Sequence, residues 1–284
     1  MIPGIAPKTA AAVPVAWAPQ PRHMFVFGAG FVGRYVSERL LAQGWQVSGT
    51  CTSVNKKREL EMLGMNASVF DATESSLENI HNLRQATHLL ISIPPIPGIG
   101  DPLLNLGEDL RRTLSHGNLE WLCYLSSTSV YGDCGGVLVD EDALDTLAKG
   151  KFLSQRQKLR ESKQYTARIH VADIYQAVLA SMCIRCARKI FNVVDDDPAP
   201  RAEVFAFARS LIQRRYPDLI TEIIDANSTG LDYQEIIIPA EKRVSNARMK
   251  QELGINLLHP TYRSGLQSII DAWQIQSQLP NISQ

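Results

Sequence analysis

The sequence predicts an α/β protein in which a parallel β-sheet carries helices on both faces. The chain has 284 residues, of which 45% are hydrophobic and 20% charged, and this is enough to bury a substantial core. From Met24 to about residue 127, short apolar segments alternate with segments of helical periodicity. The first apolar segment leads directly into a glycine-rich turn and then into a helix. Such alternation is typical of parallel strands joined by helical crossovers.

The elements of the first half follow one another in a regular order. The first strand covers 23–28. The helix after it covers 31–43, with Val32, Val36 and Leu40 on one apolar stripe and Gly44 as its stop signal. Right-handed crossovers give five such strands the spatial order 3-2-1-4-5. The other expected strands are 45–51, 67–71, 87–93 and 120–127, and the other expected helices are 56–63, 76–85 and 103–115.

The second half is α/β as well, but its pattern is less regular. We expect a tail at 1–22, a nucleotide-binding domain at 23–142, a smaller C-terminal α/β region on the substrate side at 143–278, and a tail at 279–284. The C-terminal region is expected to contain strands at 189–194 and 235–240 and helices at 171–182, 202–215, 245–253 and 262–278.

The glycine-rich turn is the most informative motif of the chain. Gly28-x-Gly30-x-x-Gly33 follows a strand and opens a helix, which is the context of a dinucleotide-binding fingerprint in a Rossmann-type, doubly wound sheet. Gly28 permits the turn, Gly30 lets a pyrophosphate approach the backbone, and Gly33 lets the helix pack on the sheet. The pyrophosphate is expected on the N–H groups at the start of the helix. The other residues expected to line this site are Phe31, Val32, Ile93 and Pro94.

The end of the second strand indicates which nicotinamide dinucleotide is bound. An NAD site usually has an acidic residue there, whereas this strand ends in Thr52 and Ser53 and is followed by Lys56, Lys57 and Arg58. Hydroxyls and cations suit a 2′-phosphate, so we expect Thr52, Ser53 and Lys57 to favour NADP over NAD. The alternative is that the basic residues are a solvated helix start.

One acidic residue belongs to the same expected site. Asp71 follows the third strand and is placed to bind the adenine amino group; a turn residue or a helix cap are its alternatives.

Composition excludes several classes of function. A formal net charge of zero argues against nucleic-acid partners, and no apolar run is long enough to span a membrane. The five cysteines have irregular spacing, and the Cys183–Cys186 pair has no second pair beside it, so we expect no disulfide framework and no metal site. A cytoplasmic location is the default. Residues 1–22 contain no acidic residue and are either a disordered tail or part of a plastid leader.

The segment 125–132, Leu-Ser-Ser-Thr-Ser-Val-Tyr-Gly, closes the fifth strand. Together with the glycine turn, it resembles the extended short-chain dehydrogenase/reductase family, and more narrowly its NAD-dependent epimerase/dehydratase branch and atypical members. The resemblance covers about residues 24–270 and implies an NADP-linked oxidoreductase or epimerase. Its substrate would be a small carbonyl or hydroxyl compound, nucleotide- or sugar-linked compounds included, and a homo-oligomer is one alternative for its assembly. The further matching stretches are 168–174, 191–201, 242–246 and 252–254.

The resemblance also implies a mechanism that this chain cannot complete. In the family a Tyr phenolate does acid/base work, a Lys four residues later lowers its pKa, and a Ser orients the substrate; Ser127 falls on that Ser position. No tyrosine of this chain has a lysine four residues later, and the expected helix and sixth strand are missing between Asp142 and Ala143. We therefore expect an internal loss of roughly 30 residues or more. Redox or epimerase chemistry is then impaired.

Two alternatives remain open at this point. The chain could be an active enzyme that uses Ser127 and an unrecognised base, or a non-enzymatic NAD(P)-binding protein whose unpaired fifth strand meets a partner. Tyr131 is interpreted as structural. We interpret Asp195–Asp197 as a solvated turn and Asp173, beside His170 near the expected substrate pocket, mainly as a helix cap.

Overall fold

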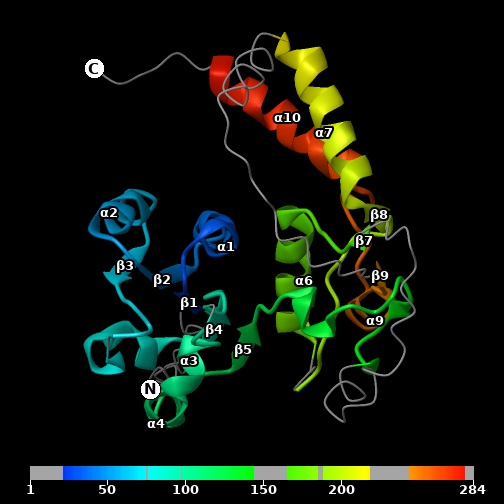
Figure 1. The fold of residues 1–284 in the computed structure, drawn as a ribbon. Helices are drawn as coiled ribbons and strands as arrows, with labels where there is room; N and C mark the ends of the chain where they lie inside the picture. The colour runs from blue at the N-terminus through cyan, green and yellow to red at the C-terminus, as the bar shows by residue number, and fades with distance from the viewer. Residues whose placement is uncertain are drawn as a thin grey trace, which may run out of the picture.

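The structure is a computed structural model that describes residues 22–74, 76–96, 98–143, 165–184, 188–217 and 243–278. Among these residues, the N-terminal half of the chain forms a sheet (Figure 1). In the second half, α6 (Val171–Cys183) stands beside the sheet, and α7 (Arg201–Arg215) and α10 (Tyr262–Gln278) lie together as a pair. None of the helices formed by the described residues is long and apolar enough to cross a membrane.

The sheet confirms the predicted fold class. Its five strands are all parallel and have the order β3-β2-β1-β4-β5, as the alternating sequence pattern predicts. The strands are β1 (His23–Phe27), β2 (Gln46–Cys51), β3 (Asn66–Val69), β4 (His88–Ile91) and β5 (Trp121–Tyr124).

The central strand β1 is buried along its whole length and contributes side chains to two apolar clusters, one on each face of the sheet. Met24 and Val26 point into the cluster on one face, which α1 (Phe31–Ala42) covers with Val36 and Leu40. Phe25 and Phe27 point into the cluster on the other face. The outer strand β5 contributes no fully buried residue to either cluster, but its Trp121 and Cys123 pack against the first one as partly buried residues.

Two of the helices predicted in the first half are divided in the structure. The segment predicted as 76–85 is two short 3₁₀ turns, η1 (Leu77–Asn79) and η2 (His81–Gln85). The backbone leaves the helical region at Ile80, which turns its side chain into the core. The segment predicted as 103–115 is α3 (Pro102–Asn105) and α4 (Gly107–Ser115), which meet at Leu106.

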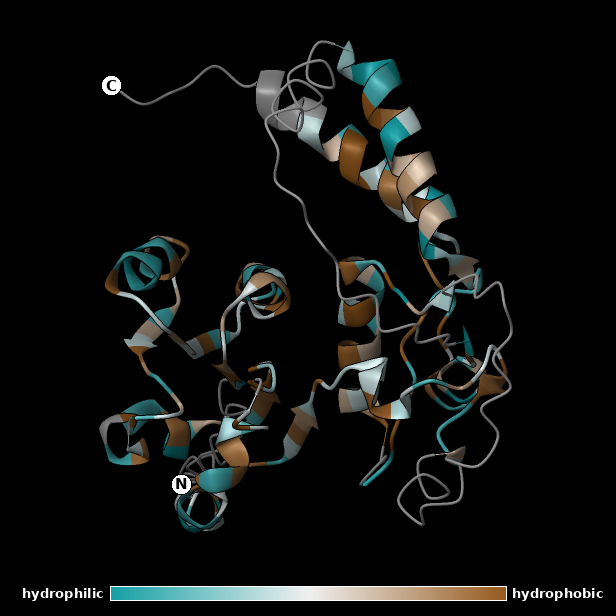
Figure 2. Ribbon diagram, viewed as in Figure 1, coloured by the Kyte–Doolittle hydropathy of each residue, from teal (hydrophilic) through white to brown (hydrophobic). Residues whose placement is uncertain are grey.

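The second half contains short strand pairs and four described helices. β6 (Leu138–Val139) pairs with β9 (Arg243–Val244), and β7 (Tyr165–Thr166) pairs with β8 (Ala199–Pro200). The apolar helix α6 packs against α1, as its concentration of hydrophobic residues in Figure 2 leads one to expect. The helices are α6 (Val171–Cys183), α7 (Arg201–Arg215), α9 (Ala247–Leu253) and α10 (Tyr262–Gln278).

The predicted strand 189–194 is wrong. The described residues of this stretch form no ladder; instead the Asn192 N–H donates to Glu141 Oε1 at 2.6 Å, and the Asp195 N–H donates to the Arg168 carbonyl at 2.7 Å. A strand needs a neighbour, and no strand of the described residues lies beyond β5 to supply one. The strand predicted at 235–240 lies outside the described residues.

Candidate functional site

Thr50, in β2, fixes the glycine-rich turn. The Gly28 N–H donates to Thr50 Oγ1 at 2.9 Å, and the Ala29 N–H donates to the Thr50 carbonyl at 2.7 Å. Thr50 itself is buried. Thr50 was not among the residues predicted from the sequence, although a hydroxyl near the end of the strand that pairs with β1 was the available signal.

The three glycines of the motif have different surroundings. A Cβ on Gly33 would lie 2.5 Å from the Gly28 carbonyl oxygen, so Gly33 is required for α1 to pack on the turn. Gly28 has a φ of +83°, and a Cβ there would lie 2.9 Å from Ile93 Cγ1. A Cβ on Gly30 would meet no atom within 4 Å. Gly28 and Gly33 therefore shape the turn, while Gly30 borders open space.

The N-terminus of α1 opens onto this space. Gly30 is its N-cap, no side chain caps the helix, and its first turn contains no acidic residue. Phe31 is 76% exposed and Val32 is half-buried. An uncapped helix N-terminus presents N–H groups and the positive end of the helix dipole, and both attract an anion such as a phosphate.

The other predicted site residues lie at the same edge of the sheet, because the carboxyl ends of parallel strands meet there. Ile93 lies against Gly28, and Pro94 beside it is exposed. Thr52 and Ser53 follow β2, Asp71 follows β3, and Ser127 follows β5. The structure therefore gathers at one edge the strand ends that sequence analysis singled out.

Lys56 and Lys57, which follow β2, are each paired with a glutamate. Ser53 Oγ caps α2 (Val54–Met62) by accepting from the Lys56 N–H at 3.3 Å, so that the helix begins two residues before the predicted 56–63. Lys57 Nζ lies 3.6 Å from Glu61 Oε1. Arg34, which sequence analysis missed although it directly follows Gly33, lies 3.6 Å from Glu59 and 2.7 Å from Glu38. These exposed pairs are weak and leave the cations accessible to an anionic ligand.

Asp71 takes the role of a turn residue. Its Oδ1 accepts hydrogen bonds from the Thr73 N–H at 2.9 Å and the Thr73 hydroxyl at 2.6 Å, and these bonds lower the pKa of the carboxyl. The side chain is exposed at the sheet edge. This is one of the alternatives that the sequence left open.

The catalytic end of the site contains no activated phenol among the described residues. Ser127 is exposed and caps the following turn by accepting from the Ser129 N–H at 3.2 Å. The Tyr124 hydroxyl donates to Asp101 Oδ2 at 2.6 Å, and burial together with that carboxylate raises the pKa of Tyr124 to about 12. Tyr131 is buried, donates to Asn192 Oδ1 at 2.8 Å, and has its pKa raised by burial. A general base needs a pKa near the working pH, and the raised pKa values of Tyr124 and Tyr131 lie further from it than that of an ordinary tyrosine.

Asp173 is not the cap of α6. The His170 ring nitrogen caps that helix by accepting from the Ala172 N–H. Asp173 is fully buried and accepts from the Leu258 N–H at 2.6 Å and the His259 N–H at 3.1 Å, so it anchors a turn 85 residues later in the sequence.

The Asp195–Asp197 stretch is not a solvated turn either. Asp195 is only 4% exposed, and burial raises its pKa to about 7 although the neighbouring Arg168 opposes the shift. Asp196 forms an ion pair with Lys250 at 2.6 Å, and Asp197 one with Arg263 at 2.8 Å. Among the described residues, no three His, Cys, Asp or Glu side chains are grouped as metal ligands.

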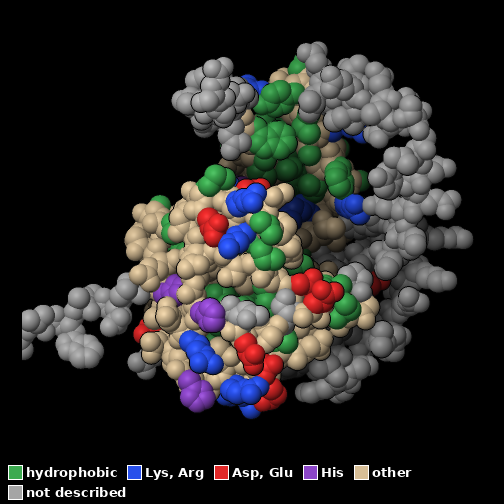
Figure 3. Space-filling view, turned by 90° about the vertical axis from the view of Figure 1, so that its left-hand side faces the viewer, with side chains coloured by type: hydrophobic (Ala, Val, Ile, Leu, Met, Phe, Trp, Pro, Cys, Tyr) green, Lys and Arg blue, Asp and Glu red, His purple; other side chains and the backbone are tan. Residues whose placement is uncertain are grey.

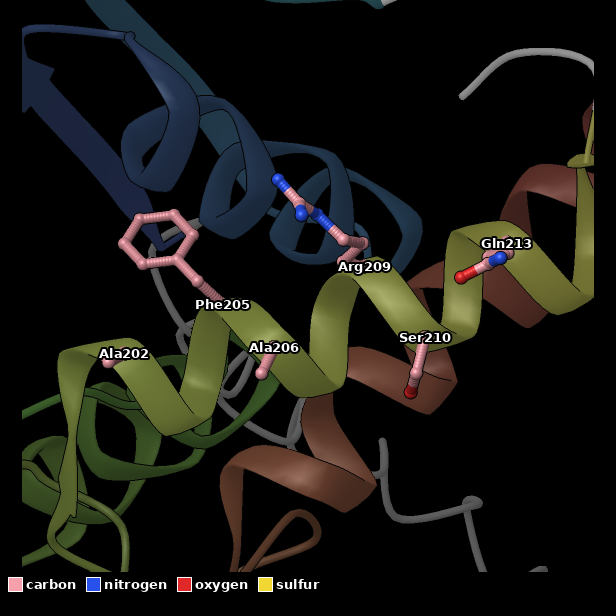
Figure 4. Close-up of a pocket in the computed structure, with 6 residues that line it drawn as sticks. All are labelled: Ala202, Phe205, Ala206, Arg209, Ser210 and Gln213. Atoms are coloured by element: carbon pink, nitrogen blue, oxygen red, sulfur yellow. The ribbon is translucent and has the colours of Figure 1, made fainter. Parts of the chain in front are cut away.

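A shallow pocket of about 350 Å³ runs along α7, and none of its lining residues belongs to the glycine turn. Figure 4 shows Phe205 and Arg209 projecting to the same side of the helix. Exposed apolar side chains gather over the α7–α10 pair, as Figure 3 shows, and Phe205 is one of them at 59% exposure. The lining residues are Ala202, Phe205, Ala206, Arg209, Ser210 and Gln213.

Comparison with family models and with curated proteins finds no match. Solved structures do match. A functionally unknown conserved protein from Silicibacter pomeroyi is 27% identical, with 89% of this chain and 99% of that chain covered and a TM-score of 0.66. Yeast methylglyoxal/isovaleraldehyde reductase Gre2, complexed with NADPH, is 15% identical, with 90% and 98% covered and a TM-score of 0.59.

UDP-N-acetylglucosamine 4-epimerase from Bacillus cereus is a further similar structure, 14% identical, with 89% of this chain and 99% of that chain covered and a TM-score of 0.57. A reductase and an epimerase thus share one architecture with this chain. The order of its five parallel strands and the glycine turn between β1 and α1 are those of a Rossmann-type sheet. The chain therefore has a Rossmann-type fold, and it shares this fold with the similar reductase and epimerase structures.

Proposed function

We propose that this chain binds NADP at the turn between β1 and α1, and that it is a member of the extended short-chain dehydrogenase/reductase family whose own redox or epimerase chemistry is impaired. The observation that carries the proposal is the open space at Gly30 beside the uncapped start of α1. The NADPH bound to the similar reductase Gre2 supports the choice of cofactor.

The described residues suggest how the dinucleotide is held. The N–H groups of Phe31 and Val32 take the pyrophosphate, because an uncapped helix start attracts anions. Ser53 and Lys57 take the 2′-phosphate at the end of β2, with Arg34 across from them on α1. NAD is the weaker ligand, because no acidic residue occupies the end of β2 to bind a free 2′-hydroxyl.

The impairment rests on the missing tyrosine and lysine pair. Ser127 retains the family position, but the phenols of Tyr124 and Tyr131 have raised pKa values and existing hydrogen-bond partners. We propose an internal loss between Asp142 and Ala143 as the cause. The gene sequence tests this directly: finding no in-frame coding sequence between those two codons would count against the loss.

A glycine substitution separates cofactor binding from folding. Gly30→Val places a branched side chain in open space, so the chain should fold normally and lose NADPH binding. Gly107→Val is the matched control, since a Cβ at the start of α4 also meets no atom within 4 Å. We would measure thermal melts with and without NADPH and with NADH beside it. A Gly30→Val variant that is stabilised by NADPH as strongly as the wild type would contradict the proposed site.

Activity measurements distinguish the remaining alternatives. We expect no turnover when NADPH is mixed with small carbonyl substrates. Stereospecific turnover that is lost in Ser127→Ala would establish an active enzyme with an unrecognised base. NADPH binding without turnover, together with a stable complex with another protein, would favour a non-enzymatic role.

A further inference from the structure

Two histidines from distant parts of the chain lie ring to ring at the start of α6. The ring centres of His170 and His259 are 4.0 Å apart. His170 directly precedes α6, and His259 lies in the turn that leads to α10. Both residues are only half-buried, so protons from the solvent can reach their rings. The pair therefore joins α6 to the turn before α10 through groups that can titrate.

The helix α10 also lies against this pair. A Cβ on Gly265, in the first turn of α10, would lie 3.7 Å from His170 Cβ and 3.9 Å from His259 Cβ. This contact brings no charge to the rings, and the nearby Arg263 is paired with Asp197 at 2.8 Å. Figure 1 shows α10 and its neighbour α7 projecting away from the sheet. The two histidines therefore lie at the joint between α6 and the α7–α10 pair.

His170 can keep its position in this joint only while its ring is neutral. Its Nδ1 accepts a hydrogen bond from the Ala172 N–H at 3.2 Å and so caps α6. Protonation would turn Nδ1 into a donor, so that two N–H groups would face each other and the cap would be lost. The new positive charge would also lie at the N-terminus of a helix, where the helix dipole disfavours cations.

The groups around the ring also act mainly against a positive charge. Burial lowers the pKa of His170 most, the neighbouring His259 and Arg39 on α1 lower it further, and Asp173 on α6 raises it. Asp173 already accepts two backbone N–H groups from the turn that contains His259. Tyr35, beside Arg39 on α1, has a pKa raised by burial and stays neutral. The closed joint therefore excludes a proton.

We propose that the contact between His170 and His259 is a pH-sensitive switch, which fastens the α7–α10 pair to α6 while His170 is neutral and opens when His170 gains a proton. A fall in pH opens the joint, because the released ring binds a proton that the capping ring cannot. Opening begins below 6.5, the ordinary pKa of a histidine, and levels off below the lowered pKa of His170. None of the residues proposed to hold NADP takes part, so the switch stands or falls separately from the proposed function.

Hydrogen exchange at two pH values tests the switch. The amides of Ala172 and His259 report on the joint, because they donate to His170 and Asp173. Their protection factors, which are corrected for the intrinsic pH dependence of exchange, should fall about three- to tenfold from about pH 7.5 to about pH 5.5. Global unfolding driven by Asp195 cannot cause this fall, because protonation of Asp195 stabilises the folded protein over the same range.

The variant His170→Asn shows whether His170 is the titrating group. Asparagine caps a helix and does not titrate, so the amide of His259 should be equally protected at both pH values. His81→Asn is the matched control, because it replaces an exposed histidine of η2 and should keep the wild-type pH dependence.

A titration of the His170 ring by NMR in the wild type does not depend on the folding of a variant, and the ring should titrate below pH 6.5. Three results would each overturn the proposal. They are a wild type whose protection ignores pH, a fall in His170→Asn as large as in the wild type, and a His170 ring that titrates at or above pH 6.5.

Discussion

The buried carboxyl of Asp195 should make the stability of this protein fall as the pH rises through the neutral range. Asp195 is 4% exposed, and its Oδ2 and the neighbouring Arg168 Nη1 have no hydrogen-bond partner within the described segments. Burial raises the pKa of Asp195 to about 7 from the 3.8 of an exposed aspartate. Between these two values the native state holds a proton that the unfolded chain has released, so raising the pH favours unfolding.

The size of the effect follows from the interval between the two pKa values. One pH unit corresponds to about 1.4 kcal/mol for one proton, so the whole interval from 3.8 to about 7 amounts to at most about 4 kcal/mol. Between pH 5 and pH 8 the native carboxyl loses its proton, and about 2.5 kcal/mol of this difference is expressed.

Urea unfolding of the wild type and of Asp195→Asn at several pH values between 5 and 8 measures this contribution. Asparagine resembles the protonated carboxyl in shape and cannot titrate, so the variant should gain about 2.5 kcal/mol relative to the wild type across this range. Glu108→Gln, in which a side chain that is 88% exposed loses its charge, serves as the control.

A constant difference between wild type and Asp195→Asn from pH 5 to pH 8 would refute the reasoning, because it would mean that Asp195 is ionised in the folded protein throughout. The same constant difference would be seen if the Arg168 guanidinium outweighed burial, because the pKa of Asp195 would then lie below 3.8 and outside this pH range. Absolute stabilities do not decide the question, since Asp195→Asn also changes the partner of Arg168 at every pH.

Three further substitutions test the site. Thr50→Val removes the acceptor of the Gly28 N–H and should cost about 1–3 kcal/mol in urea unfolding and weaken NADPH binding; unchanged binding would show that the turn holds without it. Asp173→Asn should cost about 1–3 kcal/mol, because an amide replaces a buried carboxylate that accepts two backbone N–H groups; a smaller loss would mean that the 258–259 turn holds by packing. Lys57→Ala should weaken NADPH binding about tenfold and leave NADH binding unchanged in calorimetric titrations, and equal effects on both would argue against a 2′-phosphate at Lys57.

The sequence predicted the order of the sheet because that order depends on local signals. Each strand of the first half is a short apolar run between helices, and the right-handedness of the crossovers then determines the order of the strands in the sheet. The glycine turn was predictable for the same reason, since Gly28 and Gly33 act on their own neighbours. The errors lie where the structure depends on distant residues.

Asp173 and the 189–194 segment illustrate this limit. The carboxylate of Asp173 looks like a helix cap in the sequence, but its partners are the backbone N–H groups of Leu258 and His259, which no local pattern indicates. The 189–194 segment has the composition of a strand, yet a strand forms only where another strand offers its edge. Thr50 was missed because its role depends on the pairing of β2 with β1.

The residues predicted to bind the cofactor and the serine predicted to act in catalysis follow different strands of the sheet. The predicted cofactor residues follow β1, β2, β3 and β4, and β1 is buried along its length and has a neighbouring strand on each side. Ser127 follows β5, which has a neighbour on one side only among the described strands. The internal loss that we propose after Asp142 would therefore remove support from the strand that precedes Ser127 and leave β1 with a neighbouring strand on each side. For this reason the proposed NADPH binding should survive even where the proposed loss abolishes the chemistry.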